Sequence, residues 1–404
     1  MFTLTRRAWM KGVAAAIGAA AVTPARGASD TTRRLIVVFA NGGWDPLTVF
    51  APIFGSPYVD ANTGGALGQV GDLSFVDHPD RPSVRALFEA WRDRAAIVNG
   101  ISVPSLSHEV CTRLVYTGQT VDGRADWGAT VGADQPAAYT LPNLVISGPS
   151  FPSAYGATTA RTGLNGQLAQ LTDGTILSVR DQGEPLSDAV RGLIAERTRQ
   201  RARAFAAAEP ALGEAFDAAR RRAATLTSTD GLDLGSTRYA WDRAALAVDA
   251  LAQGVSRVVT FDDDGGWDTH ATNDPSQSAL FEGLFQLLGE LVMQLDSAGL
   301  LDLTTVAVVS EMGRTPRWNA DAGRDHWPYT SALLLGGPVR GNRVISGFDE
   351  GYYPLGYDPV TGETTPAGAP LTTEHLGATL LALCDLDPAD HLPAEVAPIA
   401  SVLA

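Results

Sequence analysis

The chain has 404 residues, of which 45% are hydrophobic and 19% are charged, and its formal net charge at pH 7 is −15. This composition is typical of a globular protein and excludes a disordered or low-complexity chain. The excess of acidic residues would repel nucleic acid phosphates and anionic lipids, so neither is expected as a main partner. Lys11 is the only lysine. If the N-terminal segment is removed, the mature chain has no amine for Schiff-base chemistry, pyridoxal phosphate linkage or a P-loop.

Residues 1–28 have the pattern of an export signal. Arg6 and Arg7 precede an apolar run over residues 13–22, and small residues follow it. The apolar run is too short to span a bilayer with its present flanks, although a membrane anchor is the alternative interpretation. The segment resembles a twin-arginine signal peptide. We therefore expect export through the twin-arginine machinery to the periplasm or beyond, with no stable membrane span in the mature chain.

Continuous apolar runs rich in β-branched residues alternate with helical patterns along the rest of the chain. Such runs are typical of strands that are buried on both faces of a parallel sheet. They occupy residues 34–40, 96–98, 144–146, 255–261, 305–309 and 332–335, and helical patterns occupy 83–91, 108–116, 278–295 and 373–384. The alternation predicts an α/β fold with a mostly parallel sheet.

We expect residues 29–404 to form a single α/β domain with two additions. One is a helical insertion over about residues 184–252, and the other is an irregular, Gly-, Pro- and Tyr-rich excursion over about residues 347–370. The two cysteines, Cys111 and Cys384, could pair in an oxidising compartment, but the sequence does not place them within bonding distance.

Ligands of parallel α/β sheets bind beyond the carboxyl ends of the strands, so polar residues at strand ends are candidate site residues. Asp45 follows the first predicted strand. The acidic run at residues 262–268 and His270 follow a later one. Carboxylates this dense repel one another unless a cation or water neutralises them. We favour a cation, because Asp268 together with His270 suits zinc, manganese or iron.

Two further places carry related chemistry. Glu311 ends the strand at residues 305–309, and the pair Asp325 and His326 follows after a short loop. These three side chains could converge on one metal, and nearby arginines could hold an oxyanion or form an ordinary ion-pair network. The arginines concerned are Arg314 and Arg324.

Ser107 and His108 lie at the start of a predicted helix. Ser107 is either an N-cap or a nucleophile favoured by the helix N-terminus.

Four short motifs together resemble one known family. They read Gly-Gly-Trp-Asp at 42–45, Gly-Gly-Trp-Asp-Thr-His at 265–270, Ser-Glu-Met-Gly-Arg-Thr-Pro at 310–316 and Gly-Arg-Asp-His-Trp-Pro at 323–328. The chain is similar, from about Arg33 to its C-terminus, to the uncharacterised-domain family DUF1501, which groups with the alkaline phosphatase and sulfatase superfamily. The resemblance implies an alkaline-phosphatase-like sheet sandwiched by helices.

The superfamily scheme also implies two divalent metals near a nucleophile at a helix start. Carried over to this sequence, it suggests the metal ligands Asp45, Asp268, His270, Glu311, Asp325 and His326. The sequence departs from the scheme in three ways. Met312 replaces a histidine ligand and is a poor ligand for a hard dication. An ungapped count puts His108, rather than Ser107, at the nucleophile position. The Cys-x-Pro-x-Arg sulfatase signature is absent around Cys111.

Two functions are compatible with these residues. The first is an exported metal-dependent hydrolase or transferase of a small or polymer-borne phosphate, sulfate or related ester, in which Ser107 or His108 attacks and Arg314 or Arg324 holds the non-bridging oxygens. The second is a non-catalytic periplasmic binding or assembly protein that keeps the fold and one structural metal. We expect the six suggested ligands to share one cleft, with His108 facing it as a ligand or base and Ser107 capping the helix.

Overall fold

The computed structural model describes residues 31–163, 175–176, 184–185, 187–226, 232, 234, 237–358, 361–362, 364–365 and 368–404. The expected signal segment at residues 1–28 lies outside the described residues. Within the described ranges, no helix has the length and apolar character needed to cross a bilayer.

A nine-stranded sheet forms the centre of the molecule, in the order β14-β4-β13-β10-β1-β9-β5-β6, with β17 also paired to β4. Its strands are β1 (Arg34–Phe39), β4 (Ala95–Ser102), β5 (Asn143–Val145), β6 (Thr159–Arg161), β9 (Val258–Asp262), β10 (Thr304–Val309), β13 (Tyr329–Gly336), β14 (Arg343–Ile345) and β17 (Leu371–Thr372). The central strand β1 is parallel to β9 and β10, whereas β13 is antiparallel to β10 and β4. The expected mostly parallel α/β fold is confirmed.

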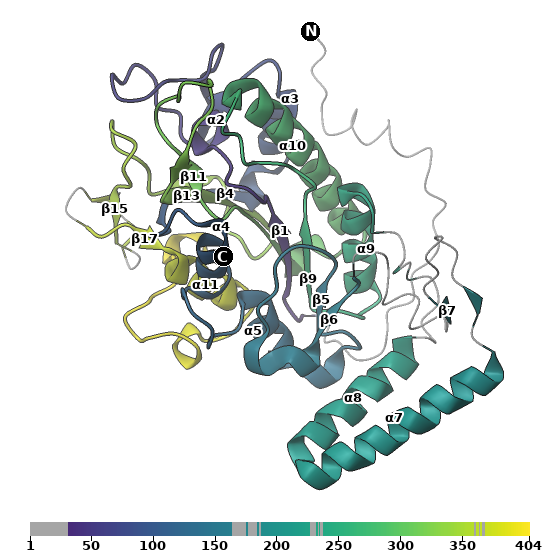
Figure 1. Cartoon of the computed structure of the whole chain (residues 1–404). Helices are drawn as coiled ribbons and strands as arrows, with labels where there is room; N and C mark the ends of the chain where they lie inside the picture. The colour runs from purple at the N-terminus through teal and green to yellow at the C-terminus, as the bar shows by residue number, and fades with distance from the viewer. Residues whose placement is uncertain are drawn as a thin grey trace.

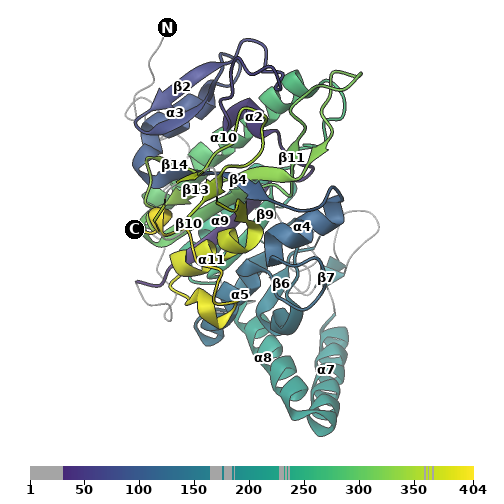
Figure 2. The same cartoon turned by 90° about the vertical axis from the view of Figure 1, so that its left-hand side faces the viewer.

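Helices cover both faces of this sheet (Figure 1, Figure 2). One face packs against α3 (Pro82–Trp91), α9 (Ala240–Ala252) and α10 (Asn273–Ser297), and the other against α4 (His108–Thr117), α5 (Trp127–Asp134) and α11 (Thr373–Leu383). Side chains of β1 alternate between the two apolar clusters, with Ile36 and Val38 in one and Leu35 and Val37 in the other. Burial on both faces explains why the strand is apolar throughout.

The remaining elements are short or peripheral. They are α2 (Pro46–Val49), β2 (Ala66–Val70), β3 (Leu73–Asp77), β7 (Thr175–Ile176), β8 (Glu184–Pro185), β11 (Gly313–Arg314), β12 (His326–Trp327), β15 (Gly356–Tyr357), β16 (Thr364–Thr365) and the 3-10 helices at Arg92–Arg94, Pro136–Ala138, Ser153–Thr158, Leu301–Leu303, Pro388–Asp390 and Ala400–Val402. The β11–β12 pair is antiparallel and carries part of the candidate site.

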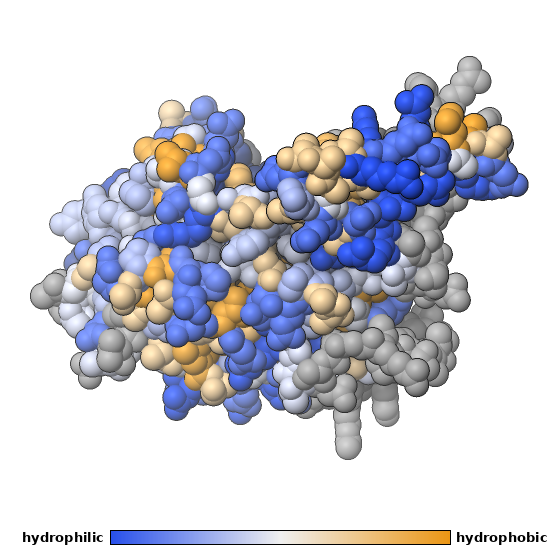
Figure 3. Space-filling view, turned by 90° about the horizontal axis from the view of Figure 1, so that it is seen from below, coloured by the Kyte–Doolittle hydropathy of each residue, from blue (hydrophilic) through white to orange (hydrophobic). Residues whose placement is uncertain are grey.

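The range expected to be a helical insertion divides into two parts. Helices α7 (Asp188–Ala208) and α8 (Pro210–Leu226) form a hairpin that projects from the body (Figure 1) and is largely hydrophilic on the face seen in Figure 3. Phe205 and Phe216 join the two helices, with ring centroids 5.3 Å apart. Helix α9 instead packs against the sheet and α10, so it belongs to the core of the domain.

The two cysteines are free and fully buried in the same apolar cluster. Cys111 lies on α4 and Cys384 directly follows α11. Burial raises the pKa of Cys111 to about 11 and the pKa of Cys384 to about 12. Both groups are therefore thiols at neutral pH, which slows their reaction with disulfide reagents.

We expect the purified protein, prepared without reductant, to show two reactive thiols per chain after denaturation in guanidinium. The native protein should react much more slowly with the same aromatic disulfide reagent. Fewer than two thiols in the denatured sample would mean that the cysteines are oxidised in the folded protein.

Candidate metal centre

The two Gly-Gly-Trp-Asp motifs lie against each other at the carboxyl ends of β1 and β9. Trp44 stacks on Phe281 of α10, and Trp267 meets the same ring edge-on with centroids 4.8 Å apart. A Cβ added to Gly42, which has φ +123°, would lie 2.6 Å from the backbone nitrogen of Asp268. The first loop therefore needs glycine here, since any larger residue would separate the two motifs.

Buried amides at the start of α10 hold both motif loops. The Asn273 side chain donates to Asp45 Oδ2 at 2.8 Å, and Gln277 Oε1 accepts from the Asp45 backbone nitrogen at 2.9 Å. Gln277 also donates to the carbonyl of Trp267 at 3.0 Å. The sequence analysis missed these two residues because the helix it expected began at residue 278, whereas α10 begins at Asn273 and its i,i+4 spacing places both amides on one face.

The acidic run after β9 is mostly neutralised by the protein itself. The buried guanidinium of Arg243, on α9, pairs with both Asp262 and Asp264. Asp263 accepts a hydrogen bond from the indole of Trp267 at 2.9 Å. The density of carboxylates that favoured a cation is thus accounted for by Arg243, and only Asp268 of this run faces the histidines.

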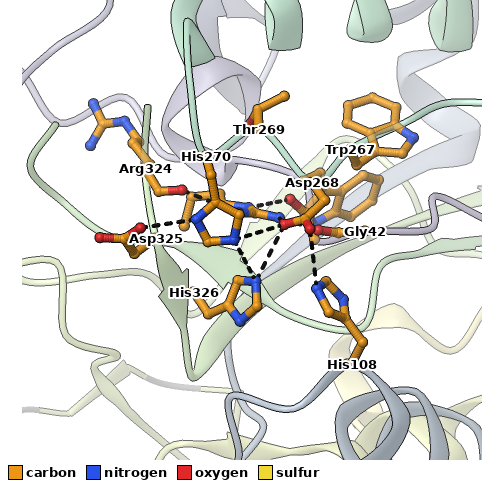
Figure 4. Close-up of polar contacts among 12 residues, drawn as sticks. Gly42, His108, Trp267, Asp268, Thr269, His270, Arg324, Asp325 and His326 are labelled. Carbon is orange, nitrogen blue, oxygen red and sulfur yellow. Dashed lines mark hydrogen bonds and ion pairs between the residues drawn. The ribbon is translucent and has the colours of Figure 1, made fainter. Parts of the chain in front are cut away.

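Three potential ligand atoms form a small triangle at the centre of the site (Figure 4). His270 Nε2 lies 3.0 Å from His326 Nε2 and 3.1 Å from Asp268 Oδ1, and His326 Nε2 lies 3.3 Å from the same oxygen. Donor atoms about 2.0–2.1 Å from a tetrahedral zinc ion lie roughly 3.3 Å apart. The spacing of the triangle therefore fits a bound transition metal.

The far nitrogen of each imidazole is held by an acceptor. His270 Nδ1 lies 2.9 Å from Asp325 Oδ1, and His326 Nδ1 lies 2.8 Å from the carbonyl oxygen of Leu106. A carbonyl or carboxylate oxygen accepts only, so in the neutral imidazole the proton sits on Nδ1. Both Nε2 atoms then present lone pairs to each other and to Asp268, and a cation between them would turn this repulsion into attraction.

His108 extends the cluster from the start of α4. Its Nε2 lies 3.6 Å from Asp268 Oδ2, and its ring meets that of His326 edge-on with centroids 4.5 Å apart. One ligand atom from each of His108, Asp268 and His326 lies within 4.8 Å of the others. His108 Nδ1 lies 2.8 Å from Glu311 Oε1, and this hydrogen bond raises the pKa of His108.

We expected Glu311 and Asp325 to be ligands. Each instead contacts the Nδ1 atom of a histidine, Glu311 that of His108 and Asp325 that of His270. Five of the six residues expected to converge are therefore linked by side-chain contacts, with Glu311 joined through His108. The sequence predicted that these carboxylates would lie close to the histidines, but not which atoms would face the triangle of ligand atoms.

Arg314 positions Asp268 rather than projecting into an open cleft. It is fully buried, donates to Asp268 Oδ1 at 2.6 Å, and bonds the carbonyl oxygens of Gly42, Gly43 and Arg324. Desolvation raises the pKa of Asp268, but the hydrogen bond and positive charge of Arg314 outweigh it, and the net shift is downward. Arg314 thus keeps the carboxylate ionised and oriented.

Asp45 and Arg324 form a separate ion pair beneath the site. Both side chains are fully buried, with Arg324 Nε 3.1 Å from Asp45 Oδ2. Arg324 also bonds the carbonyl oxygens of Thr315 and Asp60. Burial raises the pKa of Asp45, and the charge of Arg324 opposes that shift. These contacts join the loops that carry the site. They leave neither Asp45 nor Arg324 facing the triangle of ligand atoms.

Among the described polar contacts, none joins Ser107 or Met312 to the triangle of ligand atoms. Ser107 is the exposed N-cap residue of α4, without a side-chain capping hydrogen bond. Met312 is fully buried in the apolar core, and a Cβ added to Gly43 would lie 2.7 Å from its Cγ. Methionine therefore serves as packing behind the first motif loop.

Asp263 gives the site region a pH dependence of its own. Burial raises the pKa of Asp263 to about 6 from an ordinary value of 3.8. The folded state thus binds the proton more tightly than the unfolded chain, so this contribution to stability is present below about pH 4 and is lost as the pH rises towards 6. The loss is on the order of 1 kcal/mol, because the side chain is only partly buried.

Asp263→Asn should remove this loss, since the amide oxygen can still accept from Trp267. We expect urea denaturation to show that the free energy of unfolding of the variant, relative to that of the wild type, is about 1 kcal/mol higher at pH 7 than at pH 4. A difference between the two proteins that stays constant over this range would contradict the assignment.

Comparisons with known proteins place the chain in a family context. The family model described as "Protein of unknown function (DUF1501)" matches residues 187–394. No curated protein sequence matches the chain.

Similar solved structures include three bacterial proteins. The C-terminal periplasmic domain of EcEptC from Escherichia coli has 8% identity and a TM-score of 0.44, over 94% of this chain and 91% of that chain. The lipoteichoic acid synthase LtaP from Listeria monocytogenes has 9% identity and a TM-score of 0.43, over 95% and 80%. A protein in the alkaline phosphatase superfamily from Vibrio parahaemolyticus has 9% identity and a TM-score of 0.41, over 93% and 71%.

Proposed function

This chain belongs to the DUF1501 family, and on that premise we propose that it is an exported metal-dependent hydrolase or transferase of a phosphate, sulfate or related ester. The proposal is carried by the triangle of His270, His326 and Asp268, whose lone pairs face one another at 3.0–3.3 Å. The twin-arginine pattern of residues 1–28 supports the exported location.

The donor set suits zinc, manganese or iron, because two or three imidazoles are combined with one carboxylate. Such a metal would act as a Lewis acid on an ester oxygen. Around it, Asp325 and the Leu106 carbonyl would hold the Nδ1 protons of His270 and His326. Arg314 would keep Asp268 ionised.

One feature of the structure favours the alternative of a binding or assembly protein. Arg314 and Arg324, which we expected to hold the non-bridging oxygens of an ester, donate to carbonyl and carboxylate oxygens of the protein itself. A protein with this site and no turnover would keep the metal as a structural element.

His270→Ala should lower metal content and thermal stability together, because a metal that binds only the folded state stabilises it. We expect about one equivalent of transition metal in the natively exported wild type by elemental analysis. The melting temperature should fall on chelation in the wild type and change little in the variant.

His391→Ala is the matched control, since this histidine lies after α11 and away from the cluster. It should keep the metal content and melting temperature of the wild type. A wild-type melting temperature that does not respond to chelator would contradict metal binding.

The roles of Ser107 and His108 can be separated by turnover of p-nitrophenyl phosphate and p-nitrophenyl sulfate. His108 faces Asp268, whereas Ser107 is exposed at the helix start. We expect His108→Ala to lower kcat/KM by about 10²-fold or more and Ser107→Ala to retain most of it. Loss of turnover in Ser107→Ala, with His108 intact, would instead make Ser107 the nucleophile.

A further inference from the structure

Glu311 stands out as a buried carboxylate that contacts one of the site histidines. It ends β10, is fully buried, and its Oε1 lies 2.8 Å from His108 Nδ1. The same oxygen accepts the backbone N–H of Gly42 at 2.8 Å. Its second oxygen lies 3.2 Å from the hydroxyl of Ser310. The carboxylate is therefore occupied by protein donors.

These contacts select one tautomer of His108. A carboxylate oxygen only accepts, so the neutral imidazole carries its proton on Nδ1 and a lone pair on Nε2. Without Glu311, the imidazole could place its proton on Nε2, which cannot then bind a metal. Nε2 is the atom that lies 3.6 Å from Asp268 Oδ2, beside the triangle of donor atoms.

We propose that Glu311 is a positioning residue that fixes His108 with its Nε2 towards the metal centre, which makes His108 the fourth protein ligand. The proposal rests on the metal centre of the proposed function and adds the fourth member of its donor set. Three imidazoles and one carboxylate are a set suited to a divalent transition metal. Acceptors behind metal-bound histidines commonly contribute 10- to 100-fold to metal affinity.

Glu311 also has a purely structural contact, because it receives the N–H of Gly42 in the first motif loop. A simple loss of metal on substitution would not separate the two roles. If Glu311 acts through His108, its effect on metal affinity must depend on the presence of that imidazole. If Glu311 has only a structural role, its substitution should weaken metal binding equally whether or not His108 is present. A double-mutant cycle measures this dependence.

The experiment titrates cobalt(II) into the metal-free full-length mature protein and follows the visible absorption of the bound ion. Four proteins are compared: wild type, Glu311→Gln, His108→Ala and the double variant. His391→Ala is the matched control, because it removes an imidazole that lies after α11, away from Glu311 and His108. Far-ultraviolet circular dichroism checks that each variant is folded.

We expect Glu311→Gln to weaken cobalt(II) binding by about 10- to 100-fold in the wild-type background. In the His108→Ala background the same substitution should change the affinity by less than about twofold, and His391→Ala should bind nearly as the wild type. An equal loss in both backgrounds would overturn the positioning role, and so would unchanged affinity in Glu311→Gln.

The tautomer of His108 and the binding of cobalt(II) by the wild type give two further tests. In the metal-free wild type, the nitrogen chemical shifts of His108 should report the Nδ1-protonated tautomer, and the opposite tautomer would overturn the inference even if Glu311→Gln does not fold. A wild type that binds no cobalt(II) overturns it as well. If Glu311→Gln weakens cobalt(II) binding only when His108 is present, and the protein has no ester turnover, this inference would hold and only the proposed catalytic function would be contradicted.

Discussion

Two imidazole nitrogens and a carboxylate oxygen meet at 3.0–3.3 Å in this protein, and each imidazole faces a hydrogen-bond acceptor on the far side of its ring. Lone pairs at this distance repel one another, and a cation bound at the centre would remove that repulsion. The surrounding residues resist the repulsion by holding the rings and the carboxylate in place. Much of the polar interior near the strand ends serves to hold these three groups together.

The supporting layer is built from fully buried charges and amides. Arg314 orients Asp268 and joins the loop at Gly42 and Gly43 to the carbonyl of Arg324. Arg324 in turn pairs with Asp45. Removing one partner from such a pair leaves an uncompensated buried charge, which costs about 3–5 kcal/mol. These buried pairs therefore oppose any change in the position of the loops that carry the ligand atoms.

Close backbone packing adds a further constraint. A Cβ on Gly323 would lie 1.8 Å from the carbonyl oxygen of His270, and a Cβ on Gly42 would lie 2.6 Å from the backbone nitrogen of Asp268. The loop that carries Asp325 and His326 is thus pressed against the loop that carries His270. These glycines let segments from different strand ends approach closely enough to share one set of ligand atoms.

The sequence by itself determined the fold class, because apolar runs that alternate with amphipathic helices specify a sheet buried on both faces. It also placed Asp268, His270 and His326 near one another, since strand ends of a parallel sheet share one edge. It did not show that Arg243 neutralises Asp262 and Asp264, because that partner comes from a different helix.

The sequence also could not tell ligands from the residues behind them. Glu311, Asp325 and Asp45 carry the same carboxylate chemistry as Asp268, and only the direction of each side chain and its partners separate their roles. Those directions depend on contacts between segments as far apart in the chain as Gly42 and Glu311. The tertiary structure alone decides them, since a hydrogen bond to one imidazole nitrogen determines what the other nitrogen can bind.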